Sequence, residues 1–277
     1  MLGPRATPGL RAALEERMGL NEPLIYQIVY FFGNLLTGDL GIDVFTNRPV
    51  TTIISEQLNY TLVLIFASIT WSASLGIFLG CYSAVKRNTL ADKISAILSV
   101  SFIAAPSFVV SLYSLLFFAV SLRLLPAIGA GDHGDWWDQF LHLILPAFSI
   151  GLSWVGYIAR LVRASMLETM GENHIRTAKA FGLPNRWITY RYALRLAILP
   201  TITVIGVGMG FLLSAAVFAE IVFSRPGLGK LVIDSISTRN YPIVMGSVLV
   251  STIIFVASTT LSDIINAILD PRIRKQL

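Results

Sequence analysis

The chain has 277 residues, of which 55% are hydrophobic and only 13% are charged, and its mean hydropathy is +0.70. Soluble domains carry about 25% charged residues, so this composition excludes a soluble globular protein and predicts an integral membrane protein. We attribute the net charge of +5 to loop topology before any contact with nucleic acid. The single cysteine, Cys81, excludes an internal disulfide.

Residues 1–57 have a mixed composition and form the first predicted unit. The chain begins without the basic and apolar regions of a signal peptide. A helix is predicted over residues 6–18, because Thr7 and Pro8 suit its start and a glycine follows its end. Residues 24–36 are apolar but only 13 long, whereas a membrane span needs about 20 residues. They predict an interfacial or packed helix.

Five long apolar segments follow and predict an all-α, polytopic membrane protein. Helices satisfy their own backbone hydrogen bonds in lipid, so each segment is expected to be a helix. Prolines lie inside or near an end of several segments, which is consistent either with kinked helices around a pathway or with ordinary proline at span ends. The predicted spans are residues 61–85, 94–122, 140–159, 196–219 and 241–262.

The basic residues of the loops predict the orientation of these spans. Of the 21 Lys and Arg residues, 13 lie in residues 86–93, 160–195 and 270–277, which fall on one side by alternation. Basic loops face the cytoplasm, so we expect these three segments and the C-terminus to be cytoplasmic. Residues 1–57 are then exterior, although nothing in them would export them. We therefore expect a further span to precede them.

Two of the segments carry small residues four positions apart, which lets helix backbones approach closely. The first has Ser72, Gly76 and Gly80, and the fourth has Gly206 and Gly210. This spacing predicts helix packing, either within the bundle or with a partner.

Catalytic and ligand-binding patterns are weak. Residues 223–230 have a glycine and a lysine near the places that a phosphate-binding loop requires, but two of its positions do not match. The three histidines lie far apart, so no metal site or cofactor is expected. Glu220 and Asp263 lie near span ends; we expect Glu220 to be a solvated span end rather than part of an outer vestibule. Without acids or bases inside the spans, a proton-coupled carrier is not favoured.

The most distinctive stretch is the polar, basic loop of residues 160–200. Ile175, Ala178 and Gly182 share one helix face, and small residues leave that face open to another protein. Gly182 can end one helix in the left-handed conformation and Pro184 can start the next. The spacing alone equally allows two amphipathic helices lying on the bilayer.

At these residues the chain resembles the membrane subunits of ABC importers, specifically the dipeptide and oligopeptide permease family. That family has a cytoplasmic motif of Ala-x-x-x-Gly followed by Leu-Pro, which corresponds here to Ala178, Gly182, Leu199 and Pro200. Further matches in the same order are residues 3–8, 38–41, 48–49, 106–108, 142–146, 163–168, 222–229, 241–242 and 270–274. Family members usually have a transmembrane helix before the segment that corresponds to residues 3–8.

The resemblance implies a type I importer permease bundle with a transmembrane domain over residues 58–268 and a cytoplasmic tail over 269–277. It also implies four partners: a second permease subunit, two ATP-binding subunits that hydrolyse the ATP, and an exterior solute-binding protein. The permease would hydrolyse nothing and would sit in the inner membrane, importing peptides or a related small solute. The residues expected to contact the ATPase are Arg176, Thr177, Ala178, Lys179, Ala180, Gly182, Leu183, Pro184 and Trp187.

Two other classes remain open from the residues themselves. A channel or secondary carrier would transport without an ATPase partner and would use ionisable groups inside the spans. A membrane scaffold would need only an exposed docking loop and would show no uptake after reconstitution.

Overall fold

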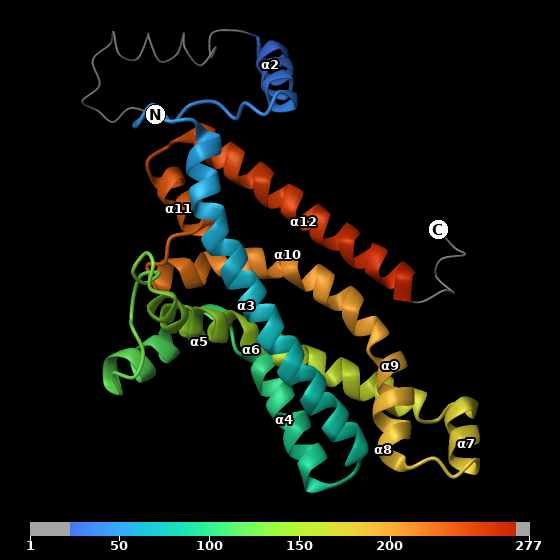
Figure 1. Cartoon of the computed structure of the whole chain (residues 1–277). Helices are drawn as coiled ribbons and strands as arrows, with labels where there is room; N and C mark the ends of the chain where they lie inside the picture. The colour runs from blue at the N-terminus through green and yellow to red at the C-terminus, as the bar shows by residue number, and fades with distance from the viewer. Residues whose placement is uncertain (1–22, 270–277) are drawn as a thin grey trace, which may run out of the picture.

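The computed structural model describes residues 23–269, and this part of the chain is helical (Figure 1). Its only β-type pairing is an isolated bridge between Ile42 and Pro49. The helix predicted over residues 6–18 and the tail 270–277 lie outside the described residues. The elements are α2 (Leu24–Leu36), α3 (Val50–Val85), α4 (Leu90–Ala104), α5 (Ser107–Ser114), the π-helical turn η1 (Leu115–Ser121), α6 (Trp136–Thr169), α7 (Asn173–Ala180), α8 (Asn185–Trp187), the π-helical turn η2 (Ile188–Ala193), α9 (Leu194–Ala197), α10 (Leu199–Val222), α11 (Leu228–Ser237) and α12 (Tyr241–Leu269).

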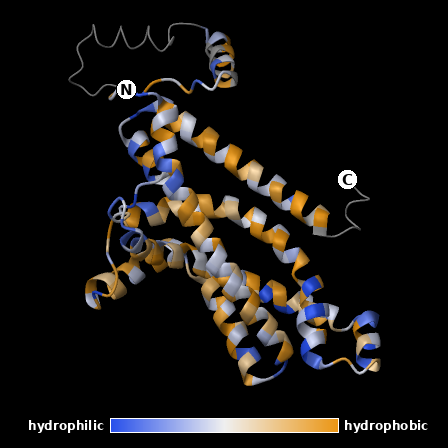
Figure 2. Cartoon of the chain, viewed as in Figure 1, coloured by the Kyte–Doolittle hydropathy of each residue, from blue (hydrophilic) through white to orange (hydrophobic). Residues whose placement is uncertain are grey.

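The predicted polytopic helical architecture is confirmed. Four helices of the described chain, α3, α6, α10 and α12, are long and apolar enough to cross a membrane. The pair formed by α4 and the α5–η1 segment gives a fifth span if it is counted as one. Figure 2 shows hydrophobic residues along these helices and polar residues gathered around α7 and α8.

The predicted span over residues 94–122 is broken rather than continuous. Pro106 lacks a backbone N–H and disfavours helical geometry in the residue before it. Ala105 is accordingly extended, with a ψ of 117°, and α4 and α5 meet at a bend of 97°. Pro146 lies inside α6, which continues through it as one helix. Pro106 and Pro146 both lie inside predicted spans, but only Pro106 interrupts its helix.

The close contact between α3 and α6 depends on the small residues of α3. A Cβ on Gly76 would lie 2.8 Å from the Cβ of Ile158, and a Cβ on Gly80 would lie 2.5 Å from the carbonyl oxygen of Ala159. Ser72 donates a hydrogen bond of 2.8 Å to the carbonyl of Gly151 on α6. These small residues thus pack inside the bundle.

The second pair of small residues lies between α10 and α12. A Cβ on Gly206 would meet the side chain of Ser262, and a Cβ on Gly210 would meet the ring of Phe255. Ser258 donates to the carbonyl of Gly206 at 2.9 Å, and Ser262 donates to the carbonyl of Ile202 at 3.0 Å. Hydroxyl groups of α12 therefore bond directly to carbonyls of α10, and the glycines of α10 leave room for the side chains of α12.

The ends of the helices form two groups at opposite ends of the bundle (Figure 1). The turn between α3 and α4 lies at one end, near α7 and α8. The start of α3, the loop before α6 and helix α11 lie at the other. Helix α2 extends beyond this second group, and apolar side chains such as Ile25 and Val29 are exposed on it. Its bounds match the predicted interfacial helix.

Candidate functional site

The polar loop that follows α6 folds into an ordered elbow, defined here as residues 173–197. It consists of α7, a turn, and the continuous helical segment α8, η2 and α9. Figure 1 shows α7 and α8 side by side at the end of the bundle. The predicted pair of short helices in this loop is therefore present.

The turn of the elbow is determined by Gly182, which has a φ of +76°. The N–H of Leu183 donates to the carbonyl of Ala178 at 3.2 Å, and the N–H of Gly182 donates to the carbonyl of Lys179 at 2.9 Å. This is the Schellman pattern of a helix end, which favours glycine because side chains are disfavoured at positive φ. Pro184 directly precedes α8, and the N–H groups of Trp187 and Ile188 donate to its carbonyl.

The face carrying Ile175 and Ala178 points into the protein. Ile175 is 0% exposed and Ala178 is 6% exposed, and both belong to a cluster with Val162 and Met166 of α6. The expectation that this small-residue face is open to a partner is therefore wrong. Burial of the only strongly apolar side chain of α7 requires the same face to turn inward.

The outward surface of the elbow is aromatic and basic. Phe181 is 81% exposed, Tyr190 62% and Trp187 52%, and the guanidinium of Arg191 lies 5.1 Å from the centroid of the Trp187 ring. Such a cation–π contact preorganises both side chains. The other predicted contact residues are exposed, except for the half-buried Leu183: they are Arg176, Thr177, Lys179, Ala180, Gly182 and Pro184.

The last two motif residues, Leu199 and Pro200, begin α10. Helix α9 ends at Ala197, which is fully buried, and Pro200 occupies the first turn of α10, where its missing N–H costs nothing. The motif therefore covers the elbow and the start of the next candidate span.

Near the elbow, an ion pair joins the buried Asp92 of α4 to the partly exposed Arg163 of α6. Asp92 is 4% exposed and accepts two bonds from Arg163, at 2.6 Å from Nε and 2.8 Å from Nη2. Ser83 donates to the same carboxylate at 2.5 Å, and the N–H of Asn88 donates at 2.9 Å. The sequence assigned Asp92 and Arg163 to separate polar loops, so spacing along the chain gave no sign that they meet.

At the opposite end of the bundle, Glu220 is fully buried, so its assignment as a solvated span end is wrong. Its Oε1 accepts the hydroxyl of Thr61 at 2.6 Å, and its Oε2 accepts the N–H of Lys230 at 3.0 Å. Thr61 in turn accepts the N–H of Leu228 at 2.8 Å. Asp92, Arg163 and Glu220 all lie outside the predicted spans 94–122, 140–159 and 196–219, but α4, α6 and α10 extend beyond those bounds and include them.

The segment tested as a phosphate loop is thus a backbone cradle for the chain's own carboxylate. Glu220 belongs to α10, but its carboxylate lies against the start of α11, where unpaired N–H groups favour an anion. Gly227 and Gly229 permit this approach: a Cβ on Gly227 would meet the Glu220 carboxylate, and one on Gly229 would lie 2.6 Å from the Cα of Val217. Burial lowers the pKa of the neighbouring Arg225 guanidinium, and the negative charge of Glu220 opposes this effect.

A third buried carboxylate, Asp43, fastens the segment before α3 to the turn before α12. It accepts hydrogen bonds from the side chain of Asn240, from the N–H groups of Phe45 and Thr46, and from the Thr46 hydroxyl. Burial by itself would raise the pKa of the Asp43 carboxyl, but these hydrogen bonds outweigh it, so the pKa lies below its ordinary value.

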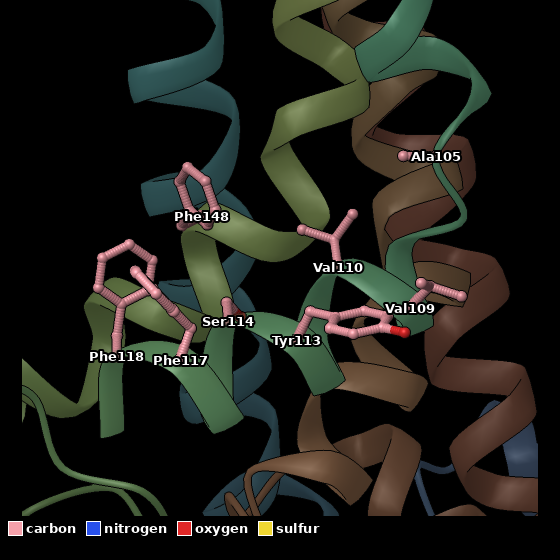
Figure 3. A pocket seen from close by; sticks show the side chains of 8 residues that line it. All are labelled: Ala105, Val109, Val110, Tyr113, Ser114, Phe117, Phe118 and Phe148. Carbon is pink, nitrogen blue, oxygen red and sulfur yellow. The ribbon is translucent and has the colours of Figure 1, made fainter. Parts of the chain in front are cut away.

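An apolar hollow of about 410 Å³ opens beside the break between α4 and α5. Figure 3 shows Ala105 at the break, Tyr113 and the two phenylalanines 117 and 118 following it, and Phe148 contributed by α6. No charged side chain lines the hollow, and its polar groups are the hydroxyls of Tyr113 and Ser114. Its walls accept an apolar surface and do not select a charge.

Metal chemistry has no support within residues 23–269, where no group of three or more His, Cys, Asp and Glu side chains is placed to hold an ion. Asp43, Asp92 and Glu220 instead use their oxygens on hydrogen bonds within the chain.

Residues 76–275 match the family model described as the inner membrane component of binding-protein-dependent transport systems. The chain belongs to this family. It is a permease subunit of an ABC importer, a multi-pass protein of the inner membrane. The family match covers α6, the elbow and both helices that hold the Glu220 cradle, α10 and α11.

Curated relatives extend the similarity over nearly the whole permease. The glutathione transport system permease protein GsiC of Escherichia coli strain K12 is 33% identical over 272 residues, covering 98% of this chain and 87% of that protein. GsiC of Shigella flexneri serotype 5b has the same identity and coverage.

Solved structures show the same fold. A chain of the inward-facing MetNI methionine ABC transporter superposes with a TM-score of 0.65 at 18% identity, covering 79% of this permease and 96% of that chain. A chain from an amino acid ABC transporter crystallised with histidines superposes with a TM-score of 0.58 at 13% identity, covering 78% of this permease and 94% of that chain.

Proposed function

We propose that this permease couples ATP hydrolysis by two partner subunits to import of a small peptide, with glutathione as the first candidate solute. A second permease subunit would complete the pathway, and an exterior solute-binding protein would deliver the solute. The chain itself would perform no hydrolysis. Glutathione is proposed because the curated relatives at 33% identity are named as glutathione permeases.

The observation that supports this role best is the elbow, which is rigidly packed on one face and exposed on the other. Ile175 and Ala178 anchor it to α6, while Phe181 and Trp187 project outward. A partner that grips these exposed aromatic groups would move the helices behind them, because a packed core transmits displacement. We therefore propose the elbow as the seat of an ATPase subunit.

This assignment also fixes the proposed orientation. The elbow and the α3–α4 turn lie at the same end of the bundle and contain basic residues such as Lys86 and Arg87. Positive loops face the cytoplasm, where ATP is available. We propose that this end and the C-terminus are cytoplasmic.

A secondary carrier is the alternative that the buried ionisable groups raise. Intramembrane carboxylates often serve proton relays. Glu220, however, accepts bonds from Thr61 and from backbone N–H groups, and Asp92 accepts four bonds. Both carboxylates therefore bind groups of the chain itself, which favours an ATP-driven importer over a proton-coupled carrier.

The test uses the reconstituted complex with all partner subunits. Phe181→Asp should leave the amount of permease in the membrane unchanged, because the side chain is 81% exposed, and should abolish ATP-dependent glutathione uptake. Trp136→Asp, at an aromatic residue that is 85% exposed and begins α6 at the opposite end of the bundle, provides a control for capture of the ATPase subunit. Retention of the ATPase by the Phe181 variant would contradict the proposed seat. Uptake without any ATPase would support the carrier class.

A further inference from the structure

The Asp92–Arg163 pair is a candidate for a function beyond helix capping. Asp92 lies in the first turn of α4, where its bond from the N–H of Asn88 satisfies the turn that enters the helix. That local task does not require an arginine from α6. The additional bidentate contact connects two helices through residues that are 71 positions apart in sequence.

The contact is built for a fixed geometry. The planar guanidinium fork of Arg163 meets both carboxylate oxygens, an arrangement with more directional constraint than a lysine could provide. Ser83 of α3 donates to the same carboxylate at 2.5 Å. One side chain, Asp92, therefore joins the end of α3, the start of α4 and the C-terminal part of α6.

The backbones at this level are also close together. A Cβ on Gly80 would lie 2.8 Å from the Cβ of Val162 and 3.1 Å from the N atom of Arg163. Further along α6, Met166 packs in one cluster with Ala84 of α3 and Ala178 of the elbow. The ion pair thus lies within the same packed body as the inner face of the elbow.

From this juxtaposition we propose that Asp92 and Arg163 are positioning residues for energy coupling, which make the α3–α4 turn and the start of α4 move with α6 and the elbow as one rigid body. The proposal rests on the elbow being the seat of the ATPase. Displacement of the elbow then reaches α4 and the 97° break at Pro106, which borders the apolar hollow.

Loss of the pair should separate hydrolysis from transport. The seat on the elbow remains intact, so the ATPase still binds and turns over. The start of α4 no longer follows the elbow, so fewer solute molecules are imported per ATP. Coupling between two sites typically changes affinities by about 5–150-fold, so we expect the import-to-hydrolysis ratio to fall at least about fivefold in Arg163→Met.

The direct test measures distances between spin labels in the complete complex. Labels at residues 87 and 173 report the α3–α4 turn and the elbow, in a Cys81→Ala background; Asn173 is exposed and is not among the residues expected to contact the ATPase. Labels at residues 173 and 252 form a reference pair between the elbow and α12. Each pair is measured without nucleotide and with ATP and orthovanadate.

With Asp92 and Arg163 both present, we expect the 87–173 distance to stay constant between the two states while the 173–252 distance changes. Arg163→Met should make the 87–173 distance shift or broaden with nucleotide. Arg163→Lys should give an intermediate result, and Arg160→Met, an exposed arginine on the same helix, should have no effect. If the pair had only a structural role, Arg163→Met would lower the yield and melting temperature of the complex without altering these distances or the import-to-hydrolysis ratio.

Three results would overturn the proposal. The first is a constant 87–173 distance in Arg163→Met while the reference pair moves. The second is a nucleotide-dependent 87–173 distance before any substitution at Asp92 or Arg163. The third is an immobile reference pair, which would also remove the proposed function, because the ATPase would then not displace the elbow.

Discussion

The two ends of the bundle each bury a carboxylate at the end of an apolar helix, and they stabilise it by different means. Near the elbow, Asp92 is paired with the guanidinium of Arg163 on another helix. At the opposite end, Glu220 has no salt bridge within the described chain and accepts from the Thr61 hydroxyl and from the N–H of Lys230 at the start of α11. The first carboxylate is held mainly by a charged side chain of another helix, and the second by a neutral hydroxyl and a backbone N–H group.

This difference determines which substitutions can disturb each site. The Asp92 network can be altered through Arg163 or Ser83 without touching the carboxylate. The Glu220 cradle is sensitive to Glu220 itself, to Thr61 and to the glycines that let the backbone approach the carboxylate. The comparison predicts distinct patterns of tolerance at the two ends.

The largest expected effect is from Glu220→Ala. This change leaves the Thr61 hydroxyl and the N–H of Lys230 without their acceptor and opens a cavity, so we expect a loss of about 3–5 kcal/mol in unfolding free energy from the unpaired donors and the lost packing together. Thermal unfolding of the purified permease measures it. Glu168→Ala, an exposed acid on α6, is the matched control, and equal melting of the two variants would contradict the cradle.

A smaller effect is expected from Gly227→Ala. Its backbone is extended, with a φ of 167°, so the cost comes from the Cβ that would meet the Glu220 carboxylate. Overpacking of this kind costs about 1–3 kcal/mol. Limited proteolysis near residues 223–240, together with the melting temperature, should report loosening of α11.

Gly182→Ala in the elbow is the matched comparison for that variant. No atom lies within 4 Å of a Cβ built there, but the φ of +76° disfavours any side chain. We expect a cost of about 1 kcal/mol, set by the backbone alone. A larger loss of stability for Gly182→Ala than for Gly227→Ala in the same melting assay would contradict the expectation that contact with the Glu220 carboxylate costs more than positive φ alone.

Thr61→Val should lower the unfolding free energy by an amount similar to that for Gly227→Ala. The methyl group replaces a hydroxyl that donates to Glu220 and accepts the N–H of Leu228. Leaving such groups unpaired in a buried site costs about 1–3 kcal/mol. Thr252→Val, at an exposed site on α12, serves as the control, and indistinguishable melting of the two would show that the hydroxyl is dispensable.

The smallest effect is the pH dependence that arises from Asp43. Its folded-state pKa lies below the ordinary value of 3.8, so its contribution to stability is complete above that value and is lost as pH falls through the folded pKa. Melting temperatures measured from pH 6 downward should therefore fall more steeply for the native permease than for Asp43→Asn. If the melting temperatures of the two proteins fell in parallel, Asp43 would not be a source of the pH dependence.

Part of this architecture could be predicted from residue patterns. Apolar segments predicted five spans, of which four are continuous helices and the fifth is bent in the structure, and residues 24–36 predicted α2 with its observed bounds. Gly182 predicted the end of α7, because a left-handed turn favours glycine wherever it occurs. The assignment of the elbow as an ATPase seat stays a prediction.

Local sequence by itself therefore determined the helices, the turn of the elbow and the membrane class, since these depend on backbone geometry and on the transfer of apolar residues out of water. Only the tertiary structure decided that Pro106 bends its span while Pro146 does not, that Ala178 faces inward, and that Glu220 and Asp92 are buried. Each of these outcomes depends on atoms from distant parts of the chain: α6 is packed on both sides of Pro146, and Thr61 and Arg163 supply the hydrogen bonds that make burial of the two carboxylates favourable.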